Sequence, residues 1–133
     1  AALYTLLQRL DYREGTEVLL TPITIPDIVN AVIVAGYKPV FVDLDPDTQN
    51  IDVNDLERKI SENTQIVLIT HLSGIVPNFE ALKMCLKGKD VFIIEDISQN
   101  YLSEYGTEVI GTFGDAAIGS FCTTKTVWFY TAL

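Results

Sequence analysis

Residues 17–44 read EVLLTPITIPDIVNAVIVAGYKPVFVDL, and this stretch decides the fold class. Its two ends, residues 17–21 and 38–44, are short apolar runs that predict buried strands. Between them, residues 26–35 predict a helix that has Pro26 at its start and Gly36 at its stop. A strand, a helix and a second strand in this order predict two parallel strands joined by a crossover helix.

The same alternation continues along the chain. Strands are expected at residues 65–70, 91–95, 108–110 and 116–121, and helices at residues 53–60 and 78–86. Because these strand patterns are apolar on both faces, the sheet should be covered by helices on both sides. The fold class expected is therefore α/β, a three-layer α/β/α arrangement with a mostly parallel sheet. No stretch rich in Pro, Gly or Ser divides residues 1–133, so a single domain is expected.

Composition excludes several classes of protein. The chain has 133 residues, 48% of them hydrophobic, and a formal net charge of −9. This hydrophobic content excludes a disordered segment, and the acidic balance argues against a nucleic-acid partner, whose phosphates require basic side chains. The longest apolar stretch, residues 28–36, is interrupted by Asn30 and is too short to cross a membrane. Cys85 and Cys122 are isolated in apolar surroundings, which favours free thiols over a disulfide and a cytoplasmic location.

Polar residues follow each expected strand, where ligands bind to open α/β sheets. They are Thr24; Asp43 and Asp45; His71 and Ser73; Asp96 and Gln99; and Thr123, Thr124 and Lys125. Neither a dinucleotide-binding glycine motif nor a P-loop is present, so no nucleotide site is predicted from motifs.

Asp96 and Lys125 are the most informative of these residues. Asp96 follows VFIIE directly, and a carboxylate in so dry a position needs either a cationic partner or a role as cap of the following turn. Lys125 follows an apolar strand and two threonines. It is either a desolvated lysine with a nucleophilic amine or a solvated surface lysine. Ser120, five residues earlier, reads on its own as an ordinary strand serine.

A metal site is not expected. His71 is the single histidine and has no thiol nearby, so a side chain hydrogen-bonded to backbone is the expected role. Asp43, Asp45 and Asp47 do not have the spacing of an EF-hand loop, and Pro46 makes a turn the better explanation.

Several segments, in order, resemble the DegT/StrS-type sugar aminotransferases, which are pyridoxal-phosphate enzymes of the aspartate aminotransferase fold. The segments are EVLLTPITIP, NAVIVAGYKPVFVDLDPDT, HLSG, IIEDISQ and GTFGDAAIGSFCTTK. The resemblance implies a pyridoxal 5'-phosphate cofactor and amino transfer to a nucleotide-linked keto-sugar, with glutamate as a donor.

The resemblance also implies roles for five residues. Lys125 falls on the family lysine that binds the cofactor covalently and moves the proton. Asp96 falls on the carboxylate that keeps the pyridine nitrogen protonated. Gln99 falls beside the ring near its oxygen substituent, and Ser120 on the hydroxyl that binds the cofactor phosphate. Ala1 follows the family's phosphate-binding Gly-Thr, so its backbone N–H would face that phosphate.

Two departures keep alternatives open. The family usually has an aromatic residue at the position of Ile25, and after Lys125 the chain continues as TVWFYTAL instead of toward a glycine-rich turn. One alternative is a non-catalytic relative that serves as a regulatory or scaffold domain. Another is a different fold-type-I chemistry, such as sugar dehydration or an amino-acid lyase reaction. The intact Lys125 argues against dehydration, because the family's dehydratases carry histidine there.

The length implies a truncated large domain. Residues 1–133 would form the central part of the cofactor-binding domain, without the family's N-terminal segment and its C-terminal small domain. The resemblance further implies a homodimer for the full-length enzyme, because a second subunit completes the family's site.

Overall fold

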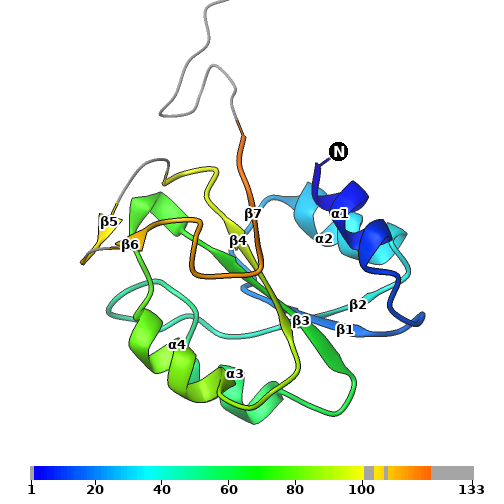
Figure 1. Cartoon of the computed structure of the whole chain (residues 1–133), viewed down its shortest axis with the longest axis horizontal. Helices are drawn as coiled ribbons and strands as arrows, with labels where there is room; N and C mark the ends of the chain where they lie inside the picture. The colour runs from blue at the N-terminus through cyan, green and yellow to red at the C-terminus, as the bar shows by residue number, and fades with distance from the viewer. Residues whose placement is uncertain (1, 101–103, 107, 121–133) are drawn as a thin grey trace, which may run out of the picture.

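Five parallel strands form the central sheet of the computed structural model, which describes residues 2–100, 104–106 and 108–120 (Figure 1). The strand order is β2-β1-β3-β4-β7, and every neighbouring pair is parallel. The strands are β1 (Glu17–Leu20), β2 (Lys38–Phe41), β3 (Thr64–Thr70), β4 (Phe92–Asp96) and β7 (Ala116–Ile118). The expected mostly parallel sheet is confirmed.

Helices cover both faces of this sheet. They are α1 (Ala2–Leu10), α2 (Pro26–Val34), α3 (Val53–Lys59) and α4 (Phe79–Leu86), with a short 3-10 turn, η1 (Leu72–Gly74), after β3. One buried cluster joins the sheet to α1 and α2, and a second joins the opposite face to α3 and α4. Figure 1 shows the two helix pairs on opposite sides of the strands, as a three-layer α/β/α fold requires.

The helix boundaries follow local chemistry. The Asp52 carboxylate caps α3 by accepting hydrogen bonds from the backbone N–H groups of Asn54 and Asp55, and Asn78 caps α4 through Ala81 N. Pro26 lies in the first turn of α2, and the chain leaves that helix through Gly36 at φ +88°. Glycine reaches this left-handed conformation without a Cβ clash.

Three expected strands differ from the prediction. The last strand, expected over residues 116–121, ends at Ile118, because its neighbour β4 ends at Asp96, which pairs with Ile118. The second strand ends at Phe41 instead of continuing to residue 44, because the backbone N–H of Asp43 donates to the Asp55 carboxylate rather than to a strand. Residues 108–110 are also outside the main sheet. There β6 (Glu108–Val109) pairs antiparallel with β5 (Glu104–Tyr105) in a separate two-stranded ladder. Among the described residues no helix is both long and apolar enough to span a membrane.

The Asp55 carboxylate anchors the turn after β2 to α3. Its Oδ2 accepts from Asp43 N at 2.7 Å and from Lys59 Nζ at 2.7 Å, and its Oδ1 accepts from Arg58 at 3.0 Å. The backbone hydrogen bond from Asp43, followed by that from Lys59, lowers the pKa of Asp55 to about 2. A depressed pKa means that the ionised form stabilises the folded state.

Replacing Asp55 by Asn tests this anchor. We expect Asp55→Asn to lower the free energy of unfolding by about 1–2 kcal/mol near neutral pH, since an amide oxygen accepts less strongly than a carboxylate. The difference from wild type should be full above the unfolded-state pKa of 3.8 and shrink as the pH falls toward about 2. Urea unfolding at several pH values measures it. A pH-independent difference would contradict the ionic origin.

Candidate active site

The carboxyl ends of the parallel strands meet at one edge of the sheet. In the sheet, β2 lies on one side of β1 and β3 lies on the other. The direction in which successive strands are added therefore reverses between β1 and β3. Ligands of open α/β sheets bind outside such a reversal. In the register of β3, β4 and β7, Thr70 pairs with Asp96 and Asp96 pairs with Ile118. His71, Asp96 and the segment leading to Ser120 therefore leave neighbouring strands at this edge.

Asp96 is a nearly buried carboxylate at this edge, with 6% of its surface exposed. Its Oδ1 accepts a hydrogen bond from Ser98 N at 3.0 Å, which is the capping bond expected for the following turn. No basic side chain among the described residues forms an ion pair with it. The capping role is therefore present, and the described part of the chain supplies no cationic partner.

Gln99 lies on the turn after Asp96 and contacts the loop that follows β3. Its Oε1 accepts from Ser73 N at 2.8 Å, and the neighbouring Asn100 donates from Nδ2 to Gly74 O at 3.1 Å. Ser73 and Gly74 both have positive φ, +55° and +78°, which turns the loop toward Gln99. The structure thus brings together two sequence-predicted residues, Gln99 and Ser73, from loops 26 positions apart.

His71 corrects the sequence-based expectation. Its side chain does not bond to backbone; Nε2 lies 3.0 Å from the carboxylate Oε2 of Glu95, and both side chains are fully buried. The backbone N–H of His71 donates to Asp96 O at 3.1 Å, which ties the end of β3 to the end of β4. The physical reason is that a charged residue buried inside β4 needs polar partners, and His71 supplies one of them.

Sequence reasoning missed Glu95. The sequence does contain an indication of its role. A glutamate that directly follows the apolar residues FII of a buried strand has to be either paired or exposed. Its carboxylate also accepts three backbone N–H groups from the segment before β7, those of Gly111, Phe113 and Gly114. Asn100, which is 3% exposed, was missed as well, because nothing in its local sequence separates it from a turn asparagine.

The aspartates after β2 form a turn, as expected. Asp45 Oδ1 accepts from the backbone N–H groups of Thr48 and Asp47, and from the Thr48 hydroxyl. The hydrogen bonds from Thr48 hold the pKa of Asp45 below its usual value. Among the described residues, no group of three or more His, Cys, Asp or Glu side chains could hold a metal ion.

Of the remaining candidate residues, the structure describes some and not others. Ser120 is exposed just beyond β7, and Ile25 is 58% exposed at the start of α2. Lys125, Ala1, Thr123, Thr124 and Cys122 lie outside the described residues. Cys85 is a free, partly buried thiol whose pKa is raised by burial.

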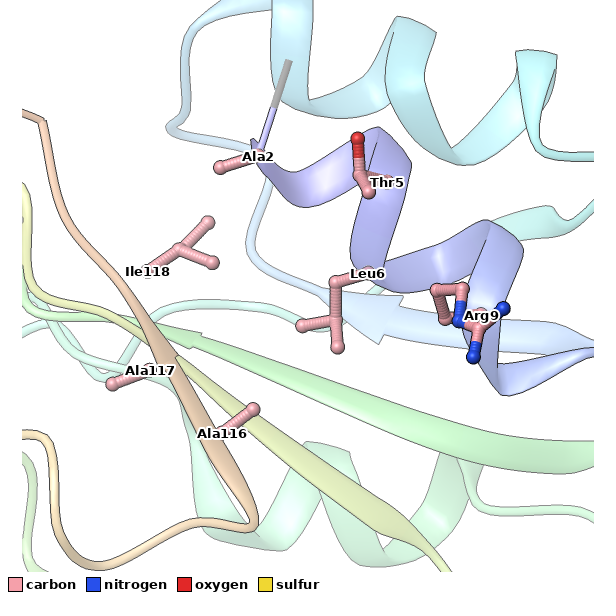
Figure 2. A pocket seen from close by; sticks show the side chains of 7 residues that line it. All are labelled: Ala2, Thr5, Leu6, Arg9, Ala116, Ala117 and Ile118. Carbon is pink, nitrogen blue, oxygen red and sulfur yellow. The ribbon is translucent and has the colours of Figure 1, made fainter.

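An open pocket of about 590 Å³ lies between α1 and β7 (Figure 2). Its walls are largely apolar, and they consist of Ala2, Thr5, Leu6, Arg9, Ala116, Ala117 and Ile118. In β4, Ile94 belongs to the core cluster under α1 and α2, so Asp96, two residues later, faces the same side of the sheet. Ile118, which lines the pocket, pairs with Asp96 in the sheet. The pocket therefore lies beside Asp96, on the face of the sheet that Asp96 faces.

Replacing Gln99 tests the contact between the two loops. We expect Gln99→Ala to speed hydrogen exchange of the Ser73 amide about 2- to 10-fold, because the amide loses its protein acceptor. Ser98→Ala is the matched control, since it changes the same turn but keeps the backbone N–H that donates to the Asp96 carboxylate. Equal protection of Ser73 in wild type and Gln99→Ala would show that this bond is absent in solution.

Comparisons with known proteins agree with this arrangement. GDP-perosamine synthase of Escherichia coli O157:H7 is 36% identical over 126 residues, which are 95% of this chain and 35% of that protein. A "pleiotropic regulatory protein" of Geobacillus stearothermophilus is 35% identical over 97% of this chain and 35% of its own length. The pyridoxal-phosphate form of a putative sugar aminotransferase, Spr1654 of Streptococcus pneumoniae, superimposes with a TM-score of 0.87 at 25% identity. That match covers 96% of this chain and 36% of Spr1654.

This chain therefore spans about a third of the length of the curated relatives it matches. The model of the DegT/DnrJ/EryC1/StrS aminotransferase family matches residues 1–131. The chain therefore belongs to the DegT/DnrJ/EryC1/StrS aminotransferase family.

Proposed function

We propose that the protein containing this chain is a pyridoxal-phosphate-dependent aminotransferase that transfers an amino group to a nucleotide-linked keto-sugar. The observation that carries the proposal is Asp96, a nearly buried carboxylate at the ligand edge whose described neighbours supply no cation. A buried carboxylate of this kind favours a cationic partner, and a protonated pyridine nitrogen is one. The family membership and the pyridoxal-phosphate form of Spr1654 support this choice of ligand.

The surroundings of Asp96 fit a flat, largely apolar ring. The open pocket adjoins its side of the sheet, and the exposed Ile25 offers a further apolar surface on the β1–α2 loop. Ile25 provides contact without the stacking that an aromatic ring would add. The side chain of Gln99 is oriented as well. Since Ser73 N–H needs an acceptor, the carbonyl end of the amide faces Ser73 and the Nε2 end is left to donate.

The roles proposed for this chain's residues follow from these positions. Asp96 would hold a proton on the ring nitrogen, and the Nε2 of Gln99 would donate to the ring's oxygen substituent. Ser120 and the backbone N–H of Ala1 would bind the phosphate, and Lys125 would bind the cofactor and move the substrate proton. When bound, pyridoxal phosphate supplies an electron-withdrawing ring that accepts the electron pair released at the substrate carbon.

The proposal extends to the whole protein. Residues 1–133 would be the central part of a cofactor-binding large domain, completed by an N-terminal segment and a C-terminal small domain. The name of GDP-perosamine synthase supports a nucleotide-linked sugar as substrate, and glutamate is the amino donor we propose. We place the reaction in the cytoplasm and expect a homodimer, in polysaccharide or secondary-metabolite sugar biosynthesis.

A second candidate is a regulatory relative without catalysis. The resemblance to the pleiotropic regulatory protein favours it, and so does Ile25 in place of the aromatic residue that the family usually carries. The two candidates differ in cofactor affinity, since a non-catalytic domain has no use for a covalently bound cofactor.

Covalent capture of the cofactor tests the proposed function. We expect the full-length protein incubated with pyridoxal phosphate to acquire a visible absorbance band, and borohydride reduction to add the cofactor's mass to the peptide that contains Lys125. Lys125→Ala should lose both signals, because the amine that reacts is gone. Lys89→Ala, which removes an exposed lysine elsewhere, is the control and should keep both signals.

Amino transfer itself is then assayed with glutamate and a panel of nucleotide-linked keto-sugars, by mass spectrometry of the products. An amino sugar confirms the proposal. A folded full-length protein with no affinity for pyridoxal phosphate would favour the regulatory candidate, and a deoxygenated sugar without an amino group would indicate dehydration instead.

A further inference from the structure

Four hydrogen bonds meet on the carboxylate of Glu95, the residue before Asp96. Oε2 accepts from His71 Nε2 and from Gly111 N, both at 3.0 Å. Oε1 accepts from Phe113 N at 2.7 Å and from Gly114 N at 2.8 Å. The side chain is fully buried on the α3–α4 side of the sheet, opposite Asp96. Burial raises the pKa of Glu95, but the hydrogen bonds from His71, Gly114 and Gly111 outweigh it and leave the pKa below its usual value.

The donors come from two segments that lie on opposite sides of β4 in the sheet. His71 begins the loop after β3, whose Ser73 N–H orients Gln99. Residues 111–114 form the turn that precedes β7, the strand that leads to Ser120. Glu95 therefore joins the loop after β3 to the turn that leads into β7, on the face of β4 opposite Asp96.

The packing around this anchor supports a fixed geometry. Phe113 stacks on Phe79 with ring centroids 4.3 Å apart, and Phe79 meets the edge of His71 at 5.9 Å. At Gly114 an added Cβ would lie 2.7 Å from Ile93 O, so the turn lies directly against β4. The turn before β7 is thus held both by hydrogen bonds to Glu95 and by close contact with the strand.

We propose that Glu95 is a positioning residue, which holds the β3–η1 loop through His71 and the turn before β7 through three backbone N–H groups. In this way it fixes Gln99 on one side of Asp96 and the approach to Ser120 on the other. The consequence for cofactor binding rests on the proposed function, whereas the positioning itself concerns only this chain's own loops.

Replacing Glu95 by Gln tests the anchor, because the amide keeps the shape of the side chain and removes its charge. An oxygen at Oε1 can still accept from Phe113 and Gly114, but an NH₂ group at the other position has no lone pair for Gly111 N. This NH₂ group can donate to His71 Nε2 only if the imidazole changes to the tautomer in which Nε2 carries no proton. We expect amide exchange at Ser73, Gly111 and Gly114 to rise about tenfold or more in the apo full-length protein, since bonds to a charged acceptor are the stronger ones.

A second variant separates the two sides of the anchor. His71→Leu removes one donor and leaves the three backbone donors in place, so exchange should rise at Ser73 but not at Gly111, Phe113 or Gly114. It also keeps the proposal testable if Glu95→Gln does not fold. Asp55→Asn is the matched control. It too replaces a carboxylate that accepts a backbone N–H, and it should leave exchange at all of these amides unchanged.

Titration with pyridoxal phosphate supplies the second readout. At a temperature where each variant is folded, Glu95→Gln should weaken cofactor affinity about 10- to 100-fold, and Asp55→Asn should leave it unchanged. If Glu95 has a purely structural role, Glu95→Gln and Asp55→Asn should both have a lower unfolding temperature, and their affinities for pyridoxal phosphate should not differ.

The outcomes separate the two proposals. Wild-type exchange rates at Ser73 and at residues 111–114 in Glu95→Gln would overturn the positioning role. Faster exchange with wild-type cofactor affinity would overturn its consequence for cofactor binding. If wild-type protein binds no pyridoxal phosphate, the proposed function fails. The exchange data still decide in that case whether Glu95 holds the two loops.

Discussion

The buried carboxylate of Glu95 is the interaction on which the candidate site depends. An ionised group inside a sheet loses its hydration, which costs several kcal/mol, and only a nearly complete set of donors offsets that loss. Here the donors are His71 and three backbone N–H groups of the turn before β7. Because the donors must surround the carboxylate, their segments are constrained as well. These segments are the loop after β3, which contacts Gln99, and the turn that leads into β7, the strand paired with Asp96.

The parallel sheet turns this constraint into a binding edge. Adjacent residues of a strand face opposite sides of the sheet, so Glu95 and Asp96 have different tasks although they are neighbours. Glu95 faces the α3–α4 layer and is satisfied internally, while Asp96 faces the α1–α2 layer beside the open pocket. The strand thereby places at the ligand edge a carboxylate that has no cationic partner among the described residues, and Glu95 holds the neighbouring segments from the other side.

The sequence predicted the architecture because its signals are local. Residues 17–44 carry the strand–helix–strand pattern, and Pro26 and Gly36 mark helix ends that the structure confirms. Asp96 and Gln99 were identified as site candidates by their place after a strand, and they do lie at the carboxyl edge. The bond between His71 and Glu95 was not predicted, since it joins residues 24 positions apart and depends on which strands become neighbours. The early end of β2 has the same cause, because the Asp55 carboxylate competes for the backbone N–H of Asp43.

A crystal structure of the full-length protein with pyridoxal phosphate would show whether Asp96 and Glu95 have these two roles. We expect the ring nitrogen to lie within about 3 Å of the Asp96 carboxylate, a hydrogen-bond distance. We also expect Glu95 still to accept from His71, Gly111, Phe113 and Gly114 beneath it. A cofactor bound away from Asp96, or a Glu95 carboxylate released from these donors when the ligand binds, would contradict these roles.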